Sequence, residues 1–267
     1  MNARRYAVSA FVGLAAGITG GLFGVGGGIV MVPGLVLLLG FLPHRAHPTS
    51  GAAIVVTAGA ALARFAFDGS VDWPAGVWLF AGAGIGALIG VRIIDRLSTE
   101  WLTRTFVLVL VVSAIRLLIP ENASESGGFA ASVDLTLGAI IGLLAAGTVA
   151  GLVAGLMGVG GGIVFVPALA AFYSIDQHVA QGTSLAAMVP TTIVAAVAHG
   201  RAGRIDWRIA GALGIGGIIG GLGGAELALT LDPLLLRRLF ASLLVVVAIR
   251  MSLQSKKRLR RSPARGI

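Results

Sequence analysis

The chain has 267 residues, of which 57% are hydrophobic and only 12% are charged. A soluble domain carries about 25% charged residues, so this composition predicts an integral membrane protein. The net charge of +9 is not a nucleic-acid signature, because six of the basic residues gather in the last twelve positions, where membrane topology explains them more simply.

Residues 1–17 have features of a secretory signal peptide, because Arg4 and Arg5 precede an apolar run with small residues. However, the stretch that begins at Gly13 returns in the middle of the chain, where no signal peptide could lie. The N-terminus is therefore expected to belong to the folded protein.

Five apolar segments follow one another in the first half of the chain, and their landmarks recur 134 residues later without a gap. In the first half the segments cover roughly residues 7–23, 29–42, 49–67, 75–95 and 102–119. His44 returns as His178, and Asp72-Trp73 returns as Asp206-Trp207. The sequence therefore predicts two homologous repeats, residues 1–119 and residues 134–253. A polar linker, residues 120–133, lies between them, and a basic tail, residues 254–267, follows the second repeat.

Each repeat contains a glycine cluster inside an apolar run. The first cluster is Gly24-Val25-Gly26-Gly27-Gly28 with Pro33 after it, and the second is Gly158-Val159-Gly160-Gly161-Gly162 with Pro167. A break of this kind exposes backbone N–H groups, and a bilayer tolerates it only when it is buried in protein or lines a polar cavity. Two matched breaks, one in each half, indicate the substrate site of a transporter.

The lengths of the first two segments decide between two architectures. As one helix, residues 6–42 would extend about 55 Å, which is too long for a hydrocarbon core of about 30 Å. Each piece alone is too short to span, which favours a re-entrant hairpin with its tip at the glycines, although a broken spanning helix is also compatible. Either way we expect an all-α polytopic membrane protein with about eight hydrophobic helices.

Loop charge distinguishes inverted from parallel repeats. A hairpin plus three spanning helices crosses the membrane an odd number of times and inverts the second repeat, whereas a broken helix plus three gives parallel repeats. Lys and Arg mark cytoplasmic loops. After the third segment, the first repeat has Arg64 beside Asp68 and Asp72, whereas the second has three arginines: Arg201, Arg204 and Arg208. The basic excess changes sides, so inverted repeats are favoured, with the N-terminus and the basic tail in the cytoplasm.

The glycine clusters and the Thr-Ser pairs that follow them form the candidate anion site. A helix N-terminus supplies N–H donors and a positive potential, and glycine allows the backbone to approach a ligand closely. The Thr-Ser pairs are predicted to cap helices and to offer hydroxyl groups to the anion. The predicted substrate-binding residues are Gly24, Gly26, Gly27, Gly28, Thr49, Ser50, Gly158, Gly160, Gly161, Gly162, Thr183 and Ser184. The alternative is that the glycines only permit a tight turn and close helix packing.

Other small and polar residues are expected to be structural. Two glycine runs with four-residue spacing predict helix-packing faces, namely Gly82, Gly86 and Gly90, and Gly216, Gly220 and Gly224. His199 is a weak candidate for proton coupling. A serine protease built on Ser184 and His199 is rejected, because the equivalent pair has Phe65 where the base would be. Without cysteine or a dinucleotide fingerprint, the sequence predicts no catalytic residue, metal site or cofactor.

The chain resembles the sulfite exporter TauE/SafE family in a motif that occurs twice. The two copies are Gly24 to Pro33 with Thr49-Ser50, and Gly158 to Pro167 with Thr183-Ser184. The resemblance implies a multi-pass transporter of the bacterial inner membrane that exports small anions, such as sulfite or organosulfonates, by alternating access. An importer or channel for related anions, or a non-transporting scaffold or sensor, is the alternative. The expected partners are a small anionic substrate and the lipid bilayer, without nucleic acid, and a homodimer is compatible with the sequence. A carrier is expected to lose transport but not folding when Gly27 or Gly161 becomes alanine.

Overall fold

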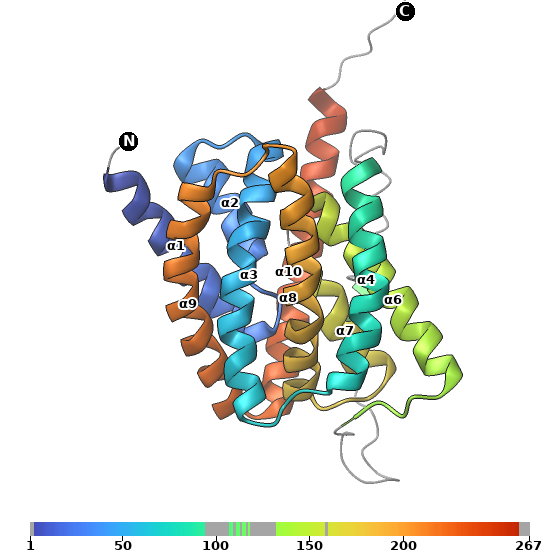
Figure 1. The fold of residues 1–267 in the computed structure, drawn as a ribbon. Coiled ribbons are helices and arrows are strands. Elements are labelled where there is room, and N and C mark those ends of the chain that lie inside the picture. Colours follow the sequence, from blue (N-terminus) through green and yellow to red (C-terminus); the bar gives the residue numbers. More distant parts are fainter. Residues whose placement is uncertain are drawn as a thin grey trace, which may run out of the picture.

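The computed structural model describes residues 3–93, 132–157 and 160–261, together with seven single positions between 107 and 117. In the first half, the described residues form α1 (Ala3–Phe23), α2 (Gly28–Leu39), α3 (Pro43–Phe67) and α4 (Trp73–Ile93). The second half contains α6 (Leu137–Met157), α7 (Gly162–Phe172), α8 (Gln177–Arg201), α9 (Trp207–Thr230) and α10 (Pro233–Arg261). Every element in these ranges is helical (Figure 1). The predicted segment 102–119, most of the linker and the end of the tail lie outside the described residues.

Six of these helices are long and apolar enough to cross a membrane: α1, α3, α4, α6, α8 and α9. The prediction that residues 7–23 form a piece too short to span is wrong, because α1 begins four residues earlier and has 21 residues. The two arginines near its start are compatible with a helix end at the membrane surface. By contrast, α2 with 12 residues and α7 with 11 are too short to span.

The first two helices of each half form a hairpin. The Arg5 guanidinium at the start of α1 donates a hydrogen bond of 3.1 Å to the carbonyl oxygen of Leu39 at the end of α2. In the second half, the Tyr173 hydroxyl, just after α7, donates to the carbonyl oxygen of Ala139 near the start of α6, at 2.9 Å. The chain therefore turns back at each glycine cluster.

Corresponding helices of the two halves run in opposite directions. In Figure 1, α3 descends and α8 ascends beside it, and α4 ascends while α9 descends. The start of α1 and the end of α10 lie at the same end of the bundle. We call this end, which also holds the α8–α9 connection, the basic end. The opposite end, where α3 joins α4, is the acidic end.

Charges divide between these two ends. Among the residues whose side chains the structure describes, the basic end carries one acidic residue, Asp206, and the following arginines: Arg4, Arg5, Arg45, Arg92, Arg201, Arg204 and Arg208. The acidic end carries Arg64, Arg237 and Arg238 beside six acidic residues: Asp68, Asp72, Asp134, Asp176, Glu226 and Asp232. This is the charge asymmetry that a membrane protein has across its two faces.

The two halves interlock through glycine-lined helix pairs. A Cβ atom on Gly216, Gly220 or Gly224 of α9 would overlap the backbone of α1. The same holds for Gly82, Gly86 and Gly90 of α4 against α6. The predicted packing faces are confirmed, and each joins the fourth helix of one half to the first helix of the other. Backbones this close gain dispersion contacts and Cα–H···O interactions, which replace the hydrophobic effect inside lipid.

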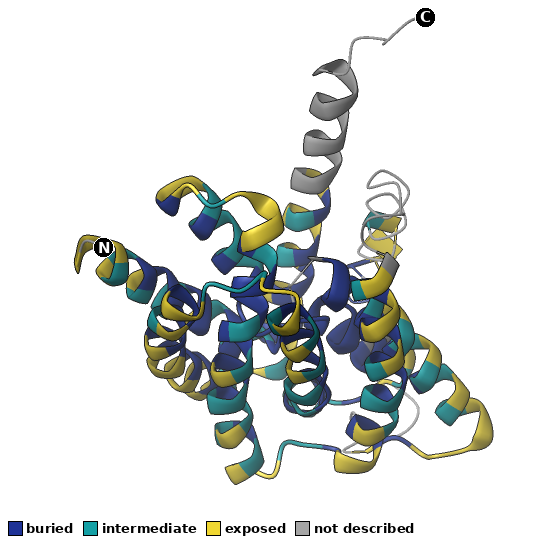
Figure 2. Ribbon diagram, turned by 45° about the horizontal axis from the view of Figure 1, so that its top comes forward, coloured by how far each residue is buried: buried dark blue, intermediate teal, exposed yellow. Residues whose placement is uncertain are grey.

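Buried residues lie towards the middle of the bundle (Figure 2), and α8 is the most buried of the six long apolar helices. Phe65 on α3, Phe165 on α7 and Phe240 on α10 are fully buried. Large apolar side chains also cover the outer surface, among them Phe11 on α1 at 68% exposure and Ile215 on α9 at 65%. An apolar exterior of this kind matches the lipid surroundings expected of a polytopic membrane protein.

Candidate functional site

Glycines at both tips adopt backbone conformations that other residues avoid. Gly24, Gly26 and Gly27 have φ angles of 70°, 71° and 85°, and Gly160 and Gly161 have 88° and 82°. A side chain in this left-handed region costs about 1–2 kcal/mol, so glycine is the residue expected there. Gly27 and Gly161 immediately precede α2 and α7, so each tip ends directly at a helix N-terminus. Gly158 lies outside the described residues.

The two tips touch each other in the middle of the bundle. A Cβ atom on Gly162 would lie 2.6 Å from the Cα of Val25 and 2.8 Å from the carbonyl oxygen of Gly24. The sulfur of Met188 on α8 would lie 2.9 Å from a Cβ on Gly26 and 2.5 Å from one on Gly160. The N-termini of α2 and α7 therefore converge on one place. A helix N-terminus has a positive dipole end and N–H groups without an intrahelical acceptor, so this place is suitable for an anion.

The prediction that the Thr-Ser pairs cap helices is wrong. Thr49-Ser50 and Thr183-Ser184 lie six residues inside helices that begin at Pro43 and Gln177. The cap of α8 is Asp176, whose carboxylate accepts a hydrogen bond of 2.9 Å from the backbone N–H of His178. Proline at the first position of α3 performs the corresponding role, because proline needs no hydrogen-bond acceptor and already has the helical φ angle.

Instead, the threonine of each half binds the connection that leads into the fourth helix of the other half. The Thr183 hydroxyl accepts a 2.8 Å hydrogen bond from the backbone N–H of Asp72, just before α4. The Thr49 hydroxyl accepts a 3.1 Å bond from the backbone N–H of Asp206, just before α9. These reciprocal bonds give both threonines a structural role.

Ser184 is the hydroxyl that reaches a glycine tip. Its Oγ donates a hydrogen bond of 2.9 Å to the carbonyl oxygen of Gly24. Ser50 is fully buried at the equivalent position of α3. Of the predicted hydroxyl groups, Ser184 therefore lies at the centre of the candidate site, while Thr49 and Thr183 hold the ends of neighbouring helices.

Two glutamines were missed by the sequence reasoning. Gln181 on α8 is fully buried beside the first tip, where a Cβ on Gly24 would lie 2.8 Å from the Cβ of Gln181. Gln177, one turn earlier, is 3% exposed. Among the described residues, neither carboxamide has a hydrogen-bond partner. Gln177, Gln181 and Ser184 are spaced four and three residues apart, which puts them on one face of a helix. This row of polar residues in an apolar segment was the sequence signal for a functional role of the two glutamines.

His199 forms an interhelical contact. Its Nε2 lies 3.2 Å from the carbonyl oxygen of Gly155 on α6, and its ring is 4% exposed. This bond ties α8 to α6 and gives the histidine a packing role, while its predicted part in proton coupling remains a prediction. In the described part of the chain, no three His, Cys, Asp or Glu side chains lie close enough together to hold a metal ion.

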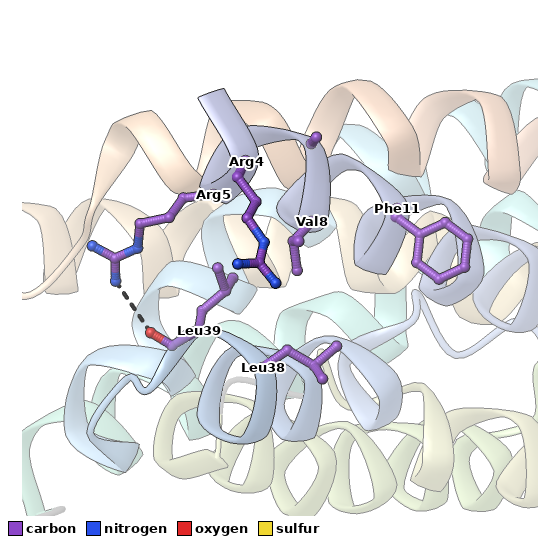
Figure 3. A pocket seen from close by; sticks show the side chains of 7 residues that line it. Arg4, Arg5, Val8, Phe11, Leu38 and Leu39 are labelled. Atoms are coloured by element: carbon purple, nitrogen blue, oxygen red, sulfur yellow. Dashed lines mark hydrogen bonds between the residues drawn. The ribbon is translucent and has the colours of Figure 1, made fainter. Parts of the chain in front are cut away.

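A cavity of about 720 Å³ lies elsewhere, at the basic end between the start of α1 and the end of α2. Figure 3 shows Arg4, Arg5 and Phe11 of α1 facing Leu38 and Leu39 of α2 around it. It lies at the open end of the first hairpin, away from the glycine tips. It is therefore not the place where the two helix N-termini converge.

Comparison with known proteins decides the family. The family model described as "Sulfite exporter TauE/SafE" matches residues 9–146 and again residues 143–267. The chain belongs to the TauE/SafE family. Each matched range contains one of the two glycine clusters.

Relatives of this TauE/SafE protein include a "Probable membrane transporter protein" of Xylella fastidiosa strain 9a5c. It is 31% identical over 89% of this chain and 90% of its own length. "Probable membrane transporter protein YunE" of Bacillus subtilis strain 168 is 26% identical over 83% of this chain and 88% of its own length. The family and these relatives support a membrane transporter, and none of these names specifies a substrate beyond the sulfite of the family description.

Proposed function

We propose that this protein carries small anions through the contact between its two glycine tips, by alternating access. The single observation that supports this most is the convergence of two helix N-termini, from α2 and α7, inside the bundle. Each N-terminus contributes about half a positive charge together with N–H donors. Breaks in membrane helices that meet in this way bind ions in secondary transporters.

The family description names sulfite as cargo and export as the direction, and we extend the proposed cargo to organosulfonates. Sulfite and the sulfonate group share an arrangement of oxygen atoms around sulfur. Several N–H donors can satisfy these oxygens without a covalent or metal bond. The neutral donors at the tips would bind such an anion weakly enough to release it on the other side of the membrane.

The two halves are proposed to be inverted repeats in the bacterial inner membrane, with both termini in the cytoplasm. The opposite directions of α3 and α8 support inversion. The arginines at the end where α1 begins support a cytoplasmic location for that end, because cytoplasmic loops carry an excess of Lys and Arg. The acidic end would then face the periplasm.

Binding to the purified protein tests the function directly. Sulfite, taurine, sulfoacetate and sulfate would each be added, and the melting temperature measured. A ligand at a hundredfold excess over its Kd stabilises the folded state by about 2.7 kcal/mol. We expect at least one of the sulfur anions to raise the melting temperature by several degrees.

Two variants show where the anion binds. Ser184→Ala removes the hydroxyl next to Gly24, and we expect a folded protein with a smaller anion-induced shift. Thr191→Val is the matched control on the same helix, because the Thr191 hydroxyl donates only to the carbonyl oxygen of Ala187 one turn before it. If no anion raises the melting temperature at millimolar concentration, or if both variants respond like the wild type, anion binding at the tips is refuted.

A further inference from the structure

Gln177 and Gln181 are polar side chains that the protein buries without satisfying them. They are 3% and 0% exposed, and the nitrogen and oxygen atoms of both carboxamides lack hydrogen-bond partners among the described residues. Each unsatisfied buried group costs about 1–3 kcal/mol, so burying two complete amides inside a membrane protein is unfavourable unless water or a ligand reaches them.

The two glutamines belong to a stripe along α8 that leads to the glycine tips. Gln177, Gln181, Ser184 and Met188 follow one another at helical spacing and share one face of the helix. Gln181 lies against Gly24, Ser184 donates to the carbonyl oxygen of Gly24, and Met188 contacts both tips. With a rise of 1.5 Å per residue, the stripe reaches from the acidic end about 10–16 Å into the bundle.

The equivalent stripe on α3 begins at the opposite end of the bundle and is more open. The positions that correspond to Gln177 and Gln181 are Pro43, which is exposed, and His47, which is partly exposed. The two stripes therefore differ in access to the surface, although they occupy matching places in the two halves. In this structure the stripe on α8 is the closed one.

We propose that Gln177, Gln181 and Ser184 line the half of the anion path between the glycine tips and the acidic end, with Gln181 in direct contact with the anion. This inference rests on the proposed function and adds the residues that recognise the anion. A carboxamide offers two N–H donors to an oxyanion without a fixed positive charge, so the anion is desolvated and still released readily. Opening this half of the protein hydrates the amides that are buried here.

The natural absence of cysteine makes the path directly testable by single-cysteine labelling. Gln181→Cys would be compared with Ala180→Cys, because Ala180 is equally buried at nearly the same depth on the same helix but points about 100° away from Gln181 around the helix axis. Membrane vesicles with the acidic end outward would be treated with an anionic and a cationic methanethiosulfonate reagent. The two rates would be normalised to the rates with free cysteine.

We expect Gln181→Cys to react about tenfold faster than Ala180→Cys, and its normalised rate to be higher with the anionic reagent, because thiol reactivity follows access and local charge. Equal rates at the two positions would overturn the proposal, and so would equal normalised rates with the two reagents. Gln177→Cys should react faster still, since it lies nearer the surface.

Gln181→Leu provides a measurement that does not depend on labelling. Leucine has a similar volume and removes two unsatisfied groups, so the variant should melt at a higher temperature than the wild type without anion and gain less from added sulfite. A lower melting temperature would mean that the amide has protein partners, which refutes the proposal. The labelling rates and the melting temperature without anion need no knowledge of the natural substrate, so they separate failure of this path from failure of sulfur-anion binding.

Discussion

Gly220 on α9 gives the sharpest test of how the two halves are joined. A Cβ at this position would overlap the carbonyl oxygen of Leu14 on α1 and lie 2.8 Å from the backbone nitrogen of Ile18. Backbone atoms cannot move aside as a flexible side chain does. Helix α1 would have to shift away from α9 along its whole length, because Gly216 and Gly224 make the same close contacts one turn to either side.

The matched control lies three residues further along the same helix. A Cβ on Gly223 would meet no atom within 4 Å, so Gly223→Ala adds a methyl group facing outward. Alanine is a better helix former than glycine by about 1 kcal/mol in water, so this variant should be neutral or slightly stabilised. Gly220→Ala gains the same propensity but overpacks the interface, which typically costs about 1–3 kcal/mol and more where backbone is involved.

Thermal unfolding of the purified variants measures this difference. For a protein of this size, 1 kcal/mol shifts the melting temperature by about 2–4 °C. Gly220→Ala should therefore melt several degrees below the wild type, and Gly223→Ala at or above it. If the two variants melt at the same temperature, α1 and α9 do not pack backbone to backbone, and the interlocked arrangement of the halves is wrong.

Three further predictions concern the tips and the acidic end. Gly27→Ala should fail to fold stably, because its Cβ would overlap the carbonyl oxygen of Ala16. In Gly161→Ala the new Cβ would lie 3.0 Å from the nearest backbone oxygen, so this variant should fold with a reduced melting temperature. Gel filtration compares the folding of the two variants. Ser184→Ala should lose about 0.5–1.5 kcal/mol of unfolding free energy with its bond to Gly24, measured by denaturant titration. Replacing Glu226 by glutamine, which breaks its exposed ion pair with Arg64, should leave the melting temperature nearly unchanged at physiological salt.

The contrast between Gly27 and Gly161 revises an expectation from the sequence. Alanine at either position was expected to separate transport from folding, since the two glycines are equivalent by the repeat. The surroundings differ, because Gly27 packs directly on the backbone of α1 while Gly161 has more room beside α6. Only Gly161→Ala is therefore suited to that experiment. Equivalence in a repeated sequence does not imply equivalent packing.

The hairpins were favoured by the sequence because residues 6–42 are too long for one helix across the bilayer, but a broken spanning helix was also compatible with the lengths, and α1 is longer than the sequence predicted. The start of α3 was not predicted, because Pro43 and the histidines after it read as loop residues, although a proline at the first helical position is favourable. The pairing of α1 with α9 was also beyond the sequence. Besides the runs on α4 and α9, glycines at four-residue spacing occur on α1 and α6, at Gly13, Gly17 and Gly21 and at Gly147, Gly151 and Gly155. Nothing in their spacing says which run faces which.

Gln181 shows a different limit. A glutamine in an apolar segment indicates a functional site, but Gln181 does not belong to the repeated motif, because His47 stands at the matching position of the first half. A symmetric pattern favours the residues that both halves share. An alternating-access carrier opens the path on one side of its site and then the path on the other side. Residues that differ between the two halves can therefore have functions that comparing the repeats does not show.

The charge of the site predicts which anions it accepts. Two helix N-termini contribute about one positive charge in total, and the side chains against the tips are neutral ones, among them Gln181, Ile54 and Met188. A singly charged sulfonate is thereby balanced, whereas a doubly charged sulfate leaves about one negative charge in a low-dielectric interior, at a cost of several kcal/mol. Methanesulfonate should therefore stabilise the protein at concentrations at least about tenfold lower than sulfate.

Sulfite allows the same comparison within one compound. Lowering the pH converts it to the singly charged hydrogensulfite, so its apparent affinity should rise as the pH falls, while that of methanesulfonate, which does not titrate in this range, should stay constant. Melting curves at several pH values, each referred to the protein without anion at the same pH, measure both. If sulfate binds as tightly as methanesulfonate, a fixed positive charge must lie at the site, and the neutral donor set described by the tips and Gln181 is not sufficient to bind the anion.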